Sequence, residues 1–410
     1  MRFSEKTQMN VSERKTNGRN SNALLWIVLA GLAIIGGGFL ISLLTPYLFP
    51  AQGSTQAQQV DNLFRFMLVI GGAIFLLVQG VLAFSVIRFR AKPGDVSDGA
   101  AIHGNTTLEF VWTAIPAVIV LVITIYAYQV WQTTRAVQPN EQVVGTVGAR
   151  FAWSFSTNVT PDQFPAGVEL SQLDPAVQAD IEEDGYITIT SPQLHTYVGQ
   201  PVQLQMVTQD VLHSFWVPAM RVKQDLLPGR TTDIRFTPVE AGMYRIVCAE
   251  LCGSGHGNMA GTLVTTDDNP VYQGAWLNVH ADEAAFRREF LEPETLAVLF
   301  PPEDPAARGR QLLASGAYPC NTCHVLSDLG WTGNLGPSLD GVGTRTQRLS
   351  QTGQPDMEAY IRNSIRRPTD FLVPGFGPLM PQFNPEPDQP NYMPEDHLNA
   401  IVAYLLTQTE

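Results

Sequence analysis

The chain has 410 residues, and its 38 aspartates and glutamates outnumber its 25 lysines and arginines, for a formal net charge of −13. This length suits two or three domains, and an acidic chain is a poor ligand for phosphate backbones, which argues against nucleic acid as a partner. Composition also changes along the chain. Apolar stretches come first, and everything after about residue 137 is polar, acidic and rich in proline.

Three stretches, 23–50, 63–87 and 109–131, are apolar and long enough to cross a bilayer. Residues 63–136 are predicted to form a helical hairpin, in which Pro116 is tolerable if neighbouring groups satisfy the backbone. Residues 1–62 hold a cationic N-terminus and the first span, an order that resembles a secretory signal. The apolar run is longer than a usual signal and no clean A-x-A site follows, so we expect a retained anchor, with a cleaved signal as the alternative.

The distribution of basic residues predicts the topology, because loops rich in lysine and arginine stay in the cytoplasm. The loop at 51–61 carries a single charge, Asp61, and is predicted to be external. Basic residues precede the first span and follow the second: Arg2, Lys6, Arg14, Lys15, Arg19, Arg88, Arg90 and Lys92. We therefore expect a multi-pass protein of a bacterial inner membrane, with everything after the third span on the periplasmic side.

Beyond the spans the residue pattern of the sequence changes twice. Residues 137–268 contain short β-patterned runs punctuated by Gly and Pro, which is typical of a small all-β sandwich or barrel. Residues 269–305 are acidic and contain proline, and we expect a linker with a helical patch near 281–298. Residues 306–410 are predicted to form helices connected by loops. The predicted fold is a multidomain membrane protein: transmembrane helices, then an all-β domain, then an all-α domain.

All four cysteines fall into two metal-binding patterns, so none is left for a structural disulfide. Residues 248–259, CAELCGSGHGNM, gather Cys248, Cys252, His256 and Met259. Thiolate, imidazole and a weak thioether are ligands of electron-transfer copper, and two thiolates on one turn of loop can bridge two ions. A second imidazole is needed, and His213 in DVLHSFWVP is its natural source.

Two other kinds of metal site use similar residues. A structural zinc site takes four cysteine and histidine ligands. The spacing of these cysteines and histidines differs from that of zinc fingers, and Met259 would have no role as a ligand. A membrane-anchored copper-delivery protein would also use C-x-x-x-C with a distant histidine. Such proteins lack the second histidine and the methionine at these offsets.

Residues 320–324, CNTCH, have the spacing for covalent attachment of a c-type haem. Cys320 and Cys323 would form the thioethers, and His324 would be the proximal ligand of the iron. A redox C-x-x-C pair is the usual competitor for so short a motif. Candidates for the sixth ligand lie downstream: Met357, Met380 and Met393. A chain that carries copper and haem c in series is most simply interpreted as an electron-transfer protein.

From about residue 63 to 266 the sequence resembles the cytochrome c oxidase subunit II family. The matching elements are HSFWVPA at 213–219, KQDLLPGR at 223–230 and C-x-E-x-C-x-x-x-H-x-x-M at 248–259. The resemblance implies a cupredoxin-like β-barrel with a dinuclear copper A centre. It implies six ligating residues: His213, Cys248, Glu250, Cys252, His256 and Met259.

The same resemblance implies roles for single residues. In the family, the glutamate matched by Glu250 binds copper through its backbone carbonyl, and its side chain ligates magnesium or manganese shared with subunit I. Glu109, in LEFVWTAIP, matches a glutamate at the mouth of a proton pathway, although the helix dipole also favours an acid there. In RFAW at 150–153, Phe151 replaces the family's electron-entry tryptophan, while Trp153 keeps the second aromatic, a possible electron-transfer residue.

The C-terminal region resembles class I cytochromes c. NLGPSLDGVG at 334–343 is similar to the Gly-Pro-x-Leu loop that packs on haem in those proteins. Met380, in GPLMPQF, has the loop position and the Met-Pro neighbour of their methionine ligand, whereas Met357 lies on an amphipathic run and is expected in the core. A His/Met pair raises the reduction potential of iron. Together the motifs resemble subunit II of a caa-type haem–copper oxidase.

This resemblance implies a subunit of a proton-translocating oxidoreductase. Electrons would pass from an external donor to haem c, then to copper A, then to the oxygen-reducing site of subunit I. Expected partners are subunit I, other oxidase subunits and a donor such as a soluble cytochrome, a blue-copper protein or a quinol-oxidising complex. The copper A subunit of a nitric oxide reductase is an alternative. The remaining histidines lack a ligand context and are expected on the surface or in loops: His103, His195, His280 and His397.

Overall fold

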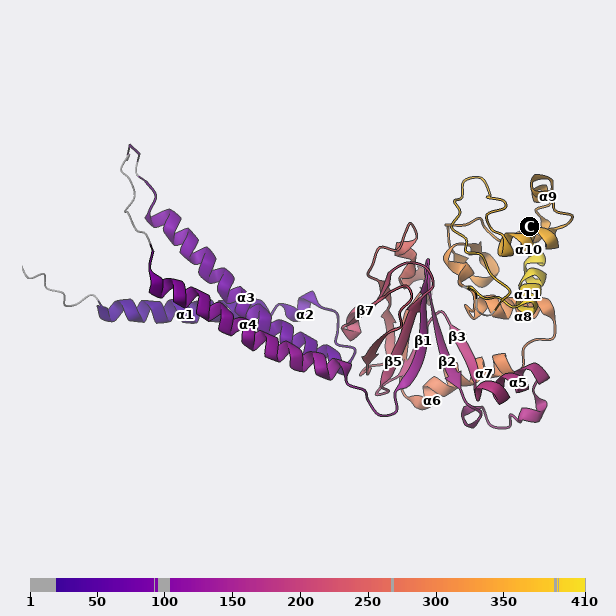
Figure 1. Ribbon diagram of the computed structural model, residues 1–410, viewed down its shortest axis with the longest axis horizontal. Coiled ribbons are helices and arrows are strands. Elements are labelled where there is room, and N and C mark those ends of the chain that lie inside the picture. Colours follow the sequence, from indigo (N-terminus) through magenta and orange to yellow (C-terminus); the bar gives the residue numbers. More distant parts are fainter. Residues whose placement is uncertain are drawn as a thin grey trace, which may run out of the picture. The chain divides into compact units, whose positions relative to one another are not determined.

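The computed structural model of the chain describes residues 20–91, 93–94, 104–266, 269–386, 389 and 391–409 (Figure 1). The described chain belongs to two compact units, Met1–Phe49 with Asp61–Tyr128, and Pro50–Val60 with Gln129–Glu410. Several residues on which predictions were made lie outside the described residues: Arg2, Lys6, Arg14, Lys15, Arg19, Lys92 and His103.

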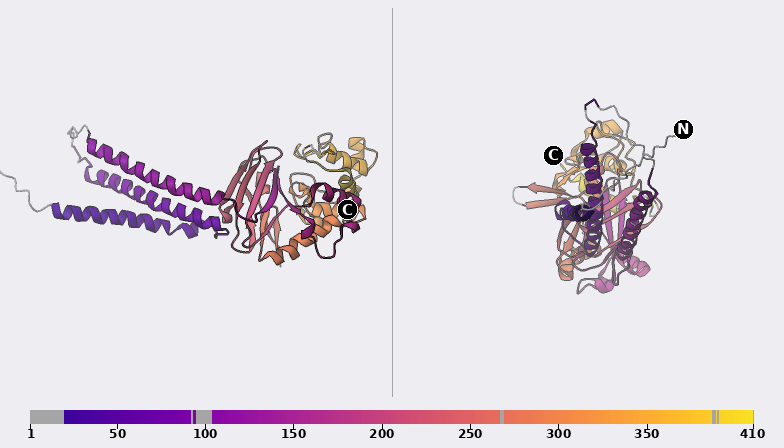
Figure 2. Two further views of the ribbon diagram at one scale, coloured as in Figure 1. Left: turned by 60° about the horizontal axis from the view of Figure 1, so that its bottom comes forward. Right: turned by 90° about the vertical axis from the view of Figure 1, so that its left-hand side faces the viewer.

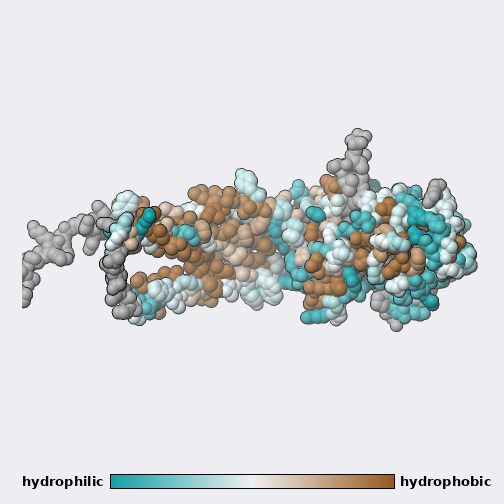
Figure 3. Space-filling model, turned by 90° about the horizontal axis from the view of Figure 1, so that it is seen from above, coloured by the Kyte–Doolittle hydropathy of each residue, from teal (hydrophilic) through white to brown (hydrophobic). Residues whose placement is uncertain are grey.

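Long helices precede the β domain, as the apolar stretches predict (Figure 2). They are α1 (Asn20–Ser42), α3 (Thr55–Arg88) and α4 (Thr106–Arg135), and the short helix α2 (Thr45–Leu48) follows α1. Among the described residues, three segments are long and apolar enough to cross a membrane: Leu25–Leu48, Thr55–Arg88 and Thr106–Arg135. Many of their large apolar side chains are exposed, and they colour this part of the surface brown in Figure 3. Pro116 lies inside α4, and α3 starts ahead of the predicted residue 63.

Glycines allow α1 and α3 to approach each other closely. A Cβ atom on Gly38 would overlap the backbone oxygen of Val69 and would lie 2.9 Å from the amide nitrogen of Ala73. On the facing helix, a Cβ atom on Gly72 would lie 3.1 Å from the Cα atom of Gly38. Small residues are typical of such crossings in membranes, where close packing drives helix association. The backbone of α1 is therefore in contact with α3.

The β domain has strands β1 (Gln142–Ala149), β2 (Ala152–Val159), β3 (Ile187–Ser191), β4 (Leu194–Tyr197), β5 (Val202–Thr208), β6 (His213–Val217), β7 (Val222–Leu226), β8 (Thr232–Phe236), β9 (Gly242–Arg245), β10 (Val247–Cys248), β11 (Thr262–Thr266), β12 (Asn269–Gln273) and β13 (Trp276–His280). The largest sheet has the order β3-β2-β1-β5-β8, with β1 parallel to β5. Other sheets have the orders β10-β6-β7 and β4-β13-β9, and β11 pairs with β12.

Alternating side chains of these strands form one apolar core. Along β5, Val202, Leu204 and Met206 are completely buried, and the residues between them are not. This period of two directs every second side chain inward. The core continues through Phe215 of β6 to the cysteines near β10. The β domain fits the predicted cupredoxin-like architecture, and its core reaches the predicted copper loop.

Residues 269–305, the predicted linker, are folded over most of their length. After β12 and β13 come α6 (Glu283–Phe286), a π-helical turn at Arg287–Leu291 and α7 (Glu292–Leu299). β13 pairs with both β4 and β9, and its Leu277 and Val279 are buried in the core of the β domain. The helices pack with α5 (Pro175–Asp184) and β3 in a second apolar cluster.

The C-terminal residues form several helices joined by long loops and have a core of their own. The helices are α8 (Pro305–Ala314), α9 (Gln347–Thr352), α10 (Met357–Arg366) and α11 (Glu395–Leu406), with a small hairpin of β14 (Val325–Leu326) and β15 (Trp331–Thr332). α8 crosses α11 at Gly309, where a Cβ atom would overlap the backbone of Ala400. Apolar faces of α8, α10 and α11 surround this core.

Candidate metal centres

Strand pairing brings the predicted copper ligands together. His213 opens β6, and β10 ends at Cys248, which lies opposite Phe215 of β6. The chain then passes Cys252 and enters a 3₁₀ helix at His256–Met259. Because β6 and β10 are neighbours in one sheet, a histidine and a cysteine 35 residues apart in sequence come into contact.

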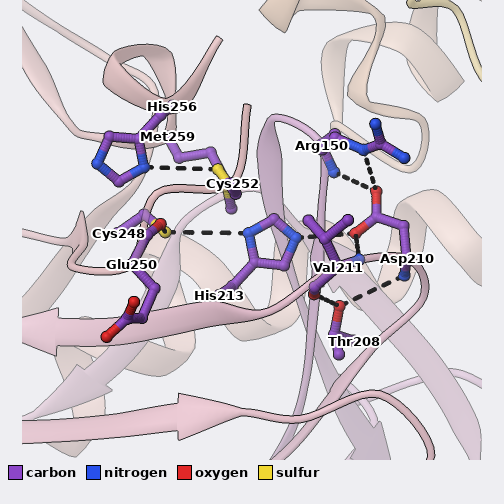
Figure 4. A network of polar contacts seen from close by, with 10 residues as sticks. All are labelled: Arg150, Thr208, Asp210, Val211, His213, Cys248, Glu250, Cys252, His256 and Met259. Carbon is purple, nitrogen blue, oxygen red and sulfur yellow. Dashed lines mark hydrogen bonds and ion pairs between the residues drawn. The ribbon is translucent and has the colours of Figure 1, made fainter. Parts of the chain in front are cut away.

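Three donors form the centre of this site (Figure 4). The ligand atoms of His213, Cys248 and Cys252 all lie within 4.8 Å of one another, and all three residues are buried. The Sγ atom of Cys248 lies 3.9 Å from Nδ1 of His213 and 3.2 Å from the backbone oxygen of Glu250. The predicted role of that oxygen as a ligand is therefore geometrically possible without any movement of the Glu250 side chain.

The other two predicted ligands lie beside Cys252. Its Sγ atom is 3.5 Å from Nδ1 of His256 and 3.4 Å from Sδ of Met259. Each thiol thus has its own imidazole, and the site combines buried sulfur and nitrogen donors. These residues fit copper, which prefers soft thiolate, thioether and imidazole ligands.

A carboxylate orients the imidazole of His213. Oδ1 of Asp210 lies 2.8 Å from Nε2 of His213, which places the proton on Nε2 and directs Nδ1 toward the thiols. Asp210 also accepts hydrogen bonds from the backbone amides of Arg150 and Val211. Burial opposes its ionisation, but these bonds outweigh it and lower the pKa of Asp210 to about 2. Burial likewise opposes the charge on His213, yet Asp210 and Cys248 raise its pKa to about 8.

The two thiols differ in acidity. Burial and the neighbouring Cys248 raise the pKa of Cys252 to about 12. Burial also disfavours the thiolate of Cys248, but hydrogen bonds with His213 and the backbone of Ser214 hold its pKa below the usual value. A metal binds the thiolate form, so ion binding must displace a proton from Cys252.

The C-x-x-C-H segment borders an apolar pocket in the C-terminal residues. Cys320, Cys323 and His324 all line this pocket. Nδ1 of His324 lies 2.7 Å from the backbone oxygen of Pro337, a geometry in which Nδ1 donates and Nε2 is left to bind a metal. A Cβ atom on Gly336 would lie 2.7 Å from Cε1 of His324, so the Gly-Pro loop packs directly on the imidazole.

The rest of the lining fits a haem. It is mostly aliphatic and aromatic, and its charged members are Arg345 and Arg348, cations suited to propionate groups. Met380 and Met393 both border the pocket. Met393 is 1% exposed, whereas Met380 lies on a loop and is only partly buried. Met357 is buried in the core at the start of α10, as expected.

Comparison with known proteins identifies the family. Residues 42–130 match the transmembrane domain of cytochrome c oxidase subunit II, and residues 143–265 match its periplasmic domain. Cytochrome c oxidase subunit 2 of Thermostichus vulcanus is 36% identical over 266 residues, which cover 58% of this chain and 80% of that protein. The chain belongs to the cytochrome c oxidase subunit II family.

Two further relatives extend this comparison. Cytochrome c oxidase subunit 2 of Synechocystis sp. is 35% identical over 232 residues, which cover 52% of this chain and 70% of that protein. Cytochrome c oxidase subunit 2 of Alkalihalophilus pseudofirmus is 26% identical over 360 residues, 85% of this chain and 87% of that protein. The chain is thus the electron-transfer, copper A subunit of a haem–copper oxidase, an oxidoreductase complex, and is membrane-anchored with an external domain.

Within this cytochrome c oxidase subunit, two predicted residues lie apart from the buried ligands. Glu250 is half-buried on the copper loop. Glu109 is exposed in the first turn of α4, where Asn105 caps the helix by accepting from the backbone amide of Leu108.

The aromatic pair at 151 and 153 is buried rather than displayed. Trp153 is 3% exposed, and its indole nitrogen donates to the backbone oxygen of Met259 at 3.1 Å. Its ring also lies edge-on to His213, with centroids 6.1 Å apart. Phe151 is 2% exposed and packs against the loop that holds Cys252. Trp153 therefore contacts two of the proposed copper ligands.

The structure corrects the expectation that His195 and His280 are surface or loop residues. His195 is in β4 and His280 ends β13, and these paired strands place the rings side by side. Nδ1 of His195 lies 3.2 Å from Nε2 of His280, whose Nδ1 lies 3.1 Å from a carboxylate oxygen of Glu289. His195 also stacks on Phe290 at 3.9 Å between centroids. Alternation along β4 and β13 puts both histidines on the face opposite Leu194 and Leu277, and Phe286 and Phe290 cover that face.

Proposed function

We propose that this subunit carries electrons from an external donor through a covalent haem c to a dinuclear copper A centre, and from there to the oxygen-reducing site of subunit I, with coupled proton translocation. The two copper ions would be held by His213, Cys248, the backbone carbonyl of Glu250, Cys252, His256 and Met259. The observation that carries the proposal is the convergence of the buried sulfur and nitrogen donors around Cys248 and Cys252.

The proposed haem c would be attached to Cys320 and Cys323, with His324 and Met380 as axial ligands. The pocket beside His324 and its two arginines support this assignment. So does the Alkalihalophilus relative, whose similarity covers 85% of this chain and so includes residues beyond the β domain. A tethered haem makes the subunit resemble the caa-type oxidases.

The proposed location is a bacterial inner membrane, with several spans and with both metal domains on the periplasmic side. The loop at 51–61, predicted to be external, supports this topology. The amide of Gly53 donates to the backbone oxygen of Ala219, and Ser54 forms a bridge with Pro238. A segment bonded to the copper domain cannot lie on the other side of the bilayer from it. The packing of Gly38 against α3 supports α1 as a retained anchor.

The remaining roles concern partners. Glu109, exposed at a helix start near the membrane boundary, would lie at the entry of a proton pathway in subunit I. The side chain of Glu250 would ligate magnesium or manganese shared with that subunit. Trp153 would serve electron transfer, since it touches two copper ligands. The acidic C-terminal residues would meet the donor, whether a soluble cytochrome, a blue-copper protein or a quinol-oxidising complex.

The copper assignment is tested in the purified oxidase. We expect two copper ions per chain in this subunit and a mixed-valence EPR signal from one electron shared between them. Cys252→Ser should remove that signal, because one bridging thiolate is lost. The matched control, Cys320→Ser, should keep the copper signal and lose one of the two proposed thioether bonds to the haem. A mixed-valence signal that survives Cys252→Ser would show that the site is built from other residues.

A further inference from the structure

The C-terminal residues contact the copper loop itself. Leu335 lines the haem pocket and also packs against the buried core of the copper domain. A Cβ atom on Gly255, next to the ligand His256, would lie 2.6 Å from Cδ1 of Leu335 and would overlap the ring of Phe151. At Gly255, Phe151 and Leu335 of the haem pocket therefore both pack against the copper loop.

The peptide between the haem-attaching cysteines faces the same surface. A small cavity separates it from the copper domain, and residues of both domains line this cavity. Asn321 and Thr322, which lie between Cys320 and Cys323, form one side. Phe151, Trp153 and the proposed ligand Met259 form the other side.

This contact is made by uncharged residues. Every residue that lines the small cavity is uncharged. A further point of contact joins Gly316 to Pro192, since a Cβ atom on Gly316 would lie 2.5 Å from Cδ of Pro192. Transient encounters between redox proteins depend on complementary charge and therefore on salt. An uncharged contact with direct packing at Leu335 and Gly316 is instead typical of a lasting interface.

The connection between the domains is short and held at both ends. α7 ends at Leu299, which is 1% exposed in the second apolar cluster, and α8 begins at Pro305. The amide group of Gln311 in α8 donates to the backbone oxygen of Ala297 in α7 at 3.2 Å. The haem-binding residues therefore start from an anchored helix rather than from a long flexible tether.

We propose that the C-terminal domain is permanently docked on the copper loop, with Gly255, Phe151 and Pro192 as its docking surface. The docked domain covers the surface through which an outside protein would otherwise reach the copper centre. Phe151 is then a packing residue of an internal interface and has no role as an entry point for a soluble donor. This inference rests on the proposed function, because it specifies how the two metal domains meet.

A pair of glycine variants tests the interface in the intact oxidase. Gly316 and Gly353 both follow a helix and have nearly equal φ angles, +71° and +70°, so alanine strains both backbones alike. Only at Gly316 does the new Cβ atom meet the copper domain, because nothing lies within 4 Å of Gly353. Hydrogen exchange should rise at least about tenfold at the amides of residues 320–322 and 253–256 in Gly316→Ala. Equal exchange in Gly316→Ala and Gly353→Ala would overturn the docked interface.

The unmodified oxidase provides a second, independent test. After photoreduction of the haem, the rate of copper reduction should not change with viscosity or salt if the domains are already docked. A rate that falls as glycerol is added shows a domain that must diffuse, and it overturns the inference while the proposed function stands. If reduced haem never passes its electron to copper, the proposed function itself fails. The two failures are therefore distinguishable.

Discussion

The imidazole of His213 shows how one side chain depends on its surroundings. Its proposed ligand role follows from residue type, but the choice of nitrogen would follow from Asp210, whose carboxylate binds Nε2 and leaves Nδ1 for a metal. Asp210 in turn is bonded to the amide of Arg150, beside Phe151. A change at residue 150 or 210 can thus reach the copper ligand without touching the metal.

Met380 is the proposed sixth ligand of the proposed haem iron. Met380→Ala should abolish the methionine–iron charge-transfer band and lower the reduction potential, because alanine offers no sulfur to the iron. Covalent haem should remain, since the cysteines are intact. Absorption spectra and redox titration of the purified oxidase provide the measurement.

A buried methionine serves as the control for that substitution. Met357 is 7% exposed in the core of the C-terminal residues. Met357→Ala should reduce the free energy of unfolding by about 2–5 kcal/mol and keep the band. Loss of the band in Met393→Ala, with the band retained in Met380→Ala, would reverse the assignment.

The helical segment from α6 to α7 is connected to the β domain by a series of polar side-chain contacts. Glu289 of the π-helical turn, His280 of β13 and His195 of β4 form a continuous chain of ring and carboxylate contacts. Phe290 covers His195. Two imidazoles this close repel each other when both are positively charged. The attachment of this segment therefore depends on pH.

The expected pH dependence follows from the pKa of His195. Burial, and then the neighbouring His280, lower that pKa from 6.5 to about 3. Below pH 6.5 the unfolded chain binds a proton that the folded chain excludes. The contribution of His195 to stability is therefore present above pH 6.5 and is lost as the pH falls toward 3, by up to about 1.4 kcal/mol per pH unit.

A substitution separates this effect from other titrating groups. His195→Phe keeps an aromatic ring on Phe290 and removes the ionisable nitrogen. The free energy of unfolding, measured in denaturant at several pH values below 6.5, should fall less steeply with acid in His195→Phe than in the unmodified chain. Identical slopes for the two proteins would mean that His195 does not set this dependence.

For the whole molecule, the series order of the metal sites is the feature to test. Deletion of residues 306–410 should leave the copper spectrum unchanged, because all proposed copper ligands precede residue 260. Oxidation of the natural donor should slow at least about tenfold, which corresponds to about 1.4 kcal/mol in activation free energy. Steady-state turnover with that donor is the measurement. Turnover at the full rate would show that the haem domain is an accessory.

The sequence by itself determined the local features of this protein. Some features depend only on neighbouring residues in the chain. They are the apolar runs long enough for a bilayer, the change from β to helical patterning, and the spacing of the cysteines and histidines. The cysteines, histidine and methionine of residues 248–259 could therefore be predicted from the sequence as ligands of one metal centre, and the structure brings them close together. The haem motif at 320–324 is equally local.

Tertiary structure decided everything that depends on pairing between distant segments. The contact of Cys248 with His213, the packing of Leu335 against the core of the β domain and the His195–His280 pair arise where strands or domains far apart in sequence meet. Composition marked residues 269–305 as a linker, but β13 inserts between β4 and β9 and buries its apolar side chains there. The apolar residues 276–280 suit a strand, but the sequence does not say which strands they pair with, because the partner strands supply the surface that they cover.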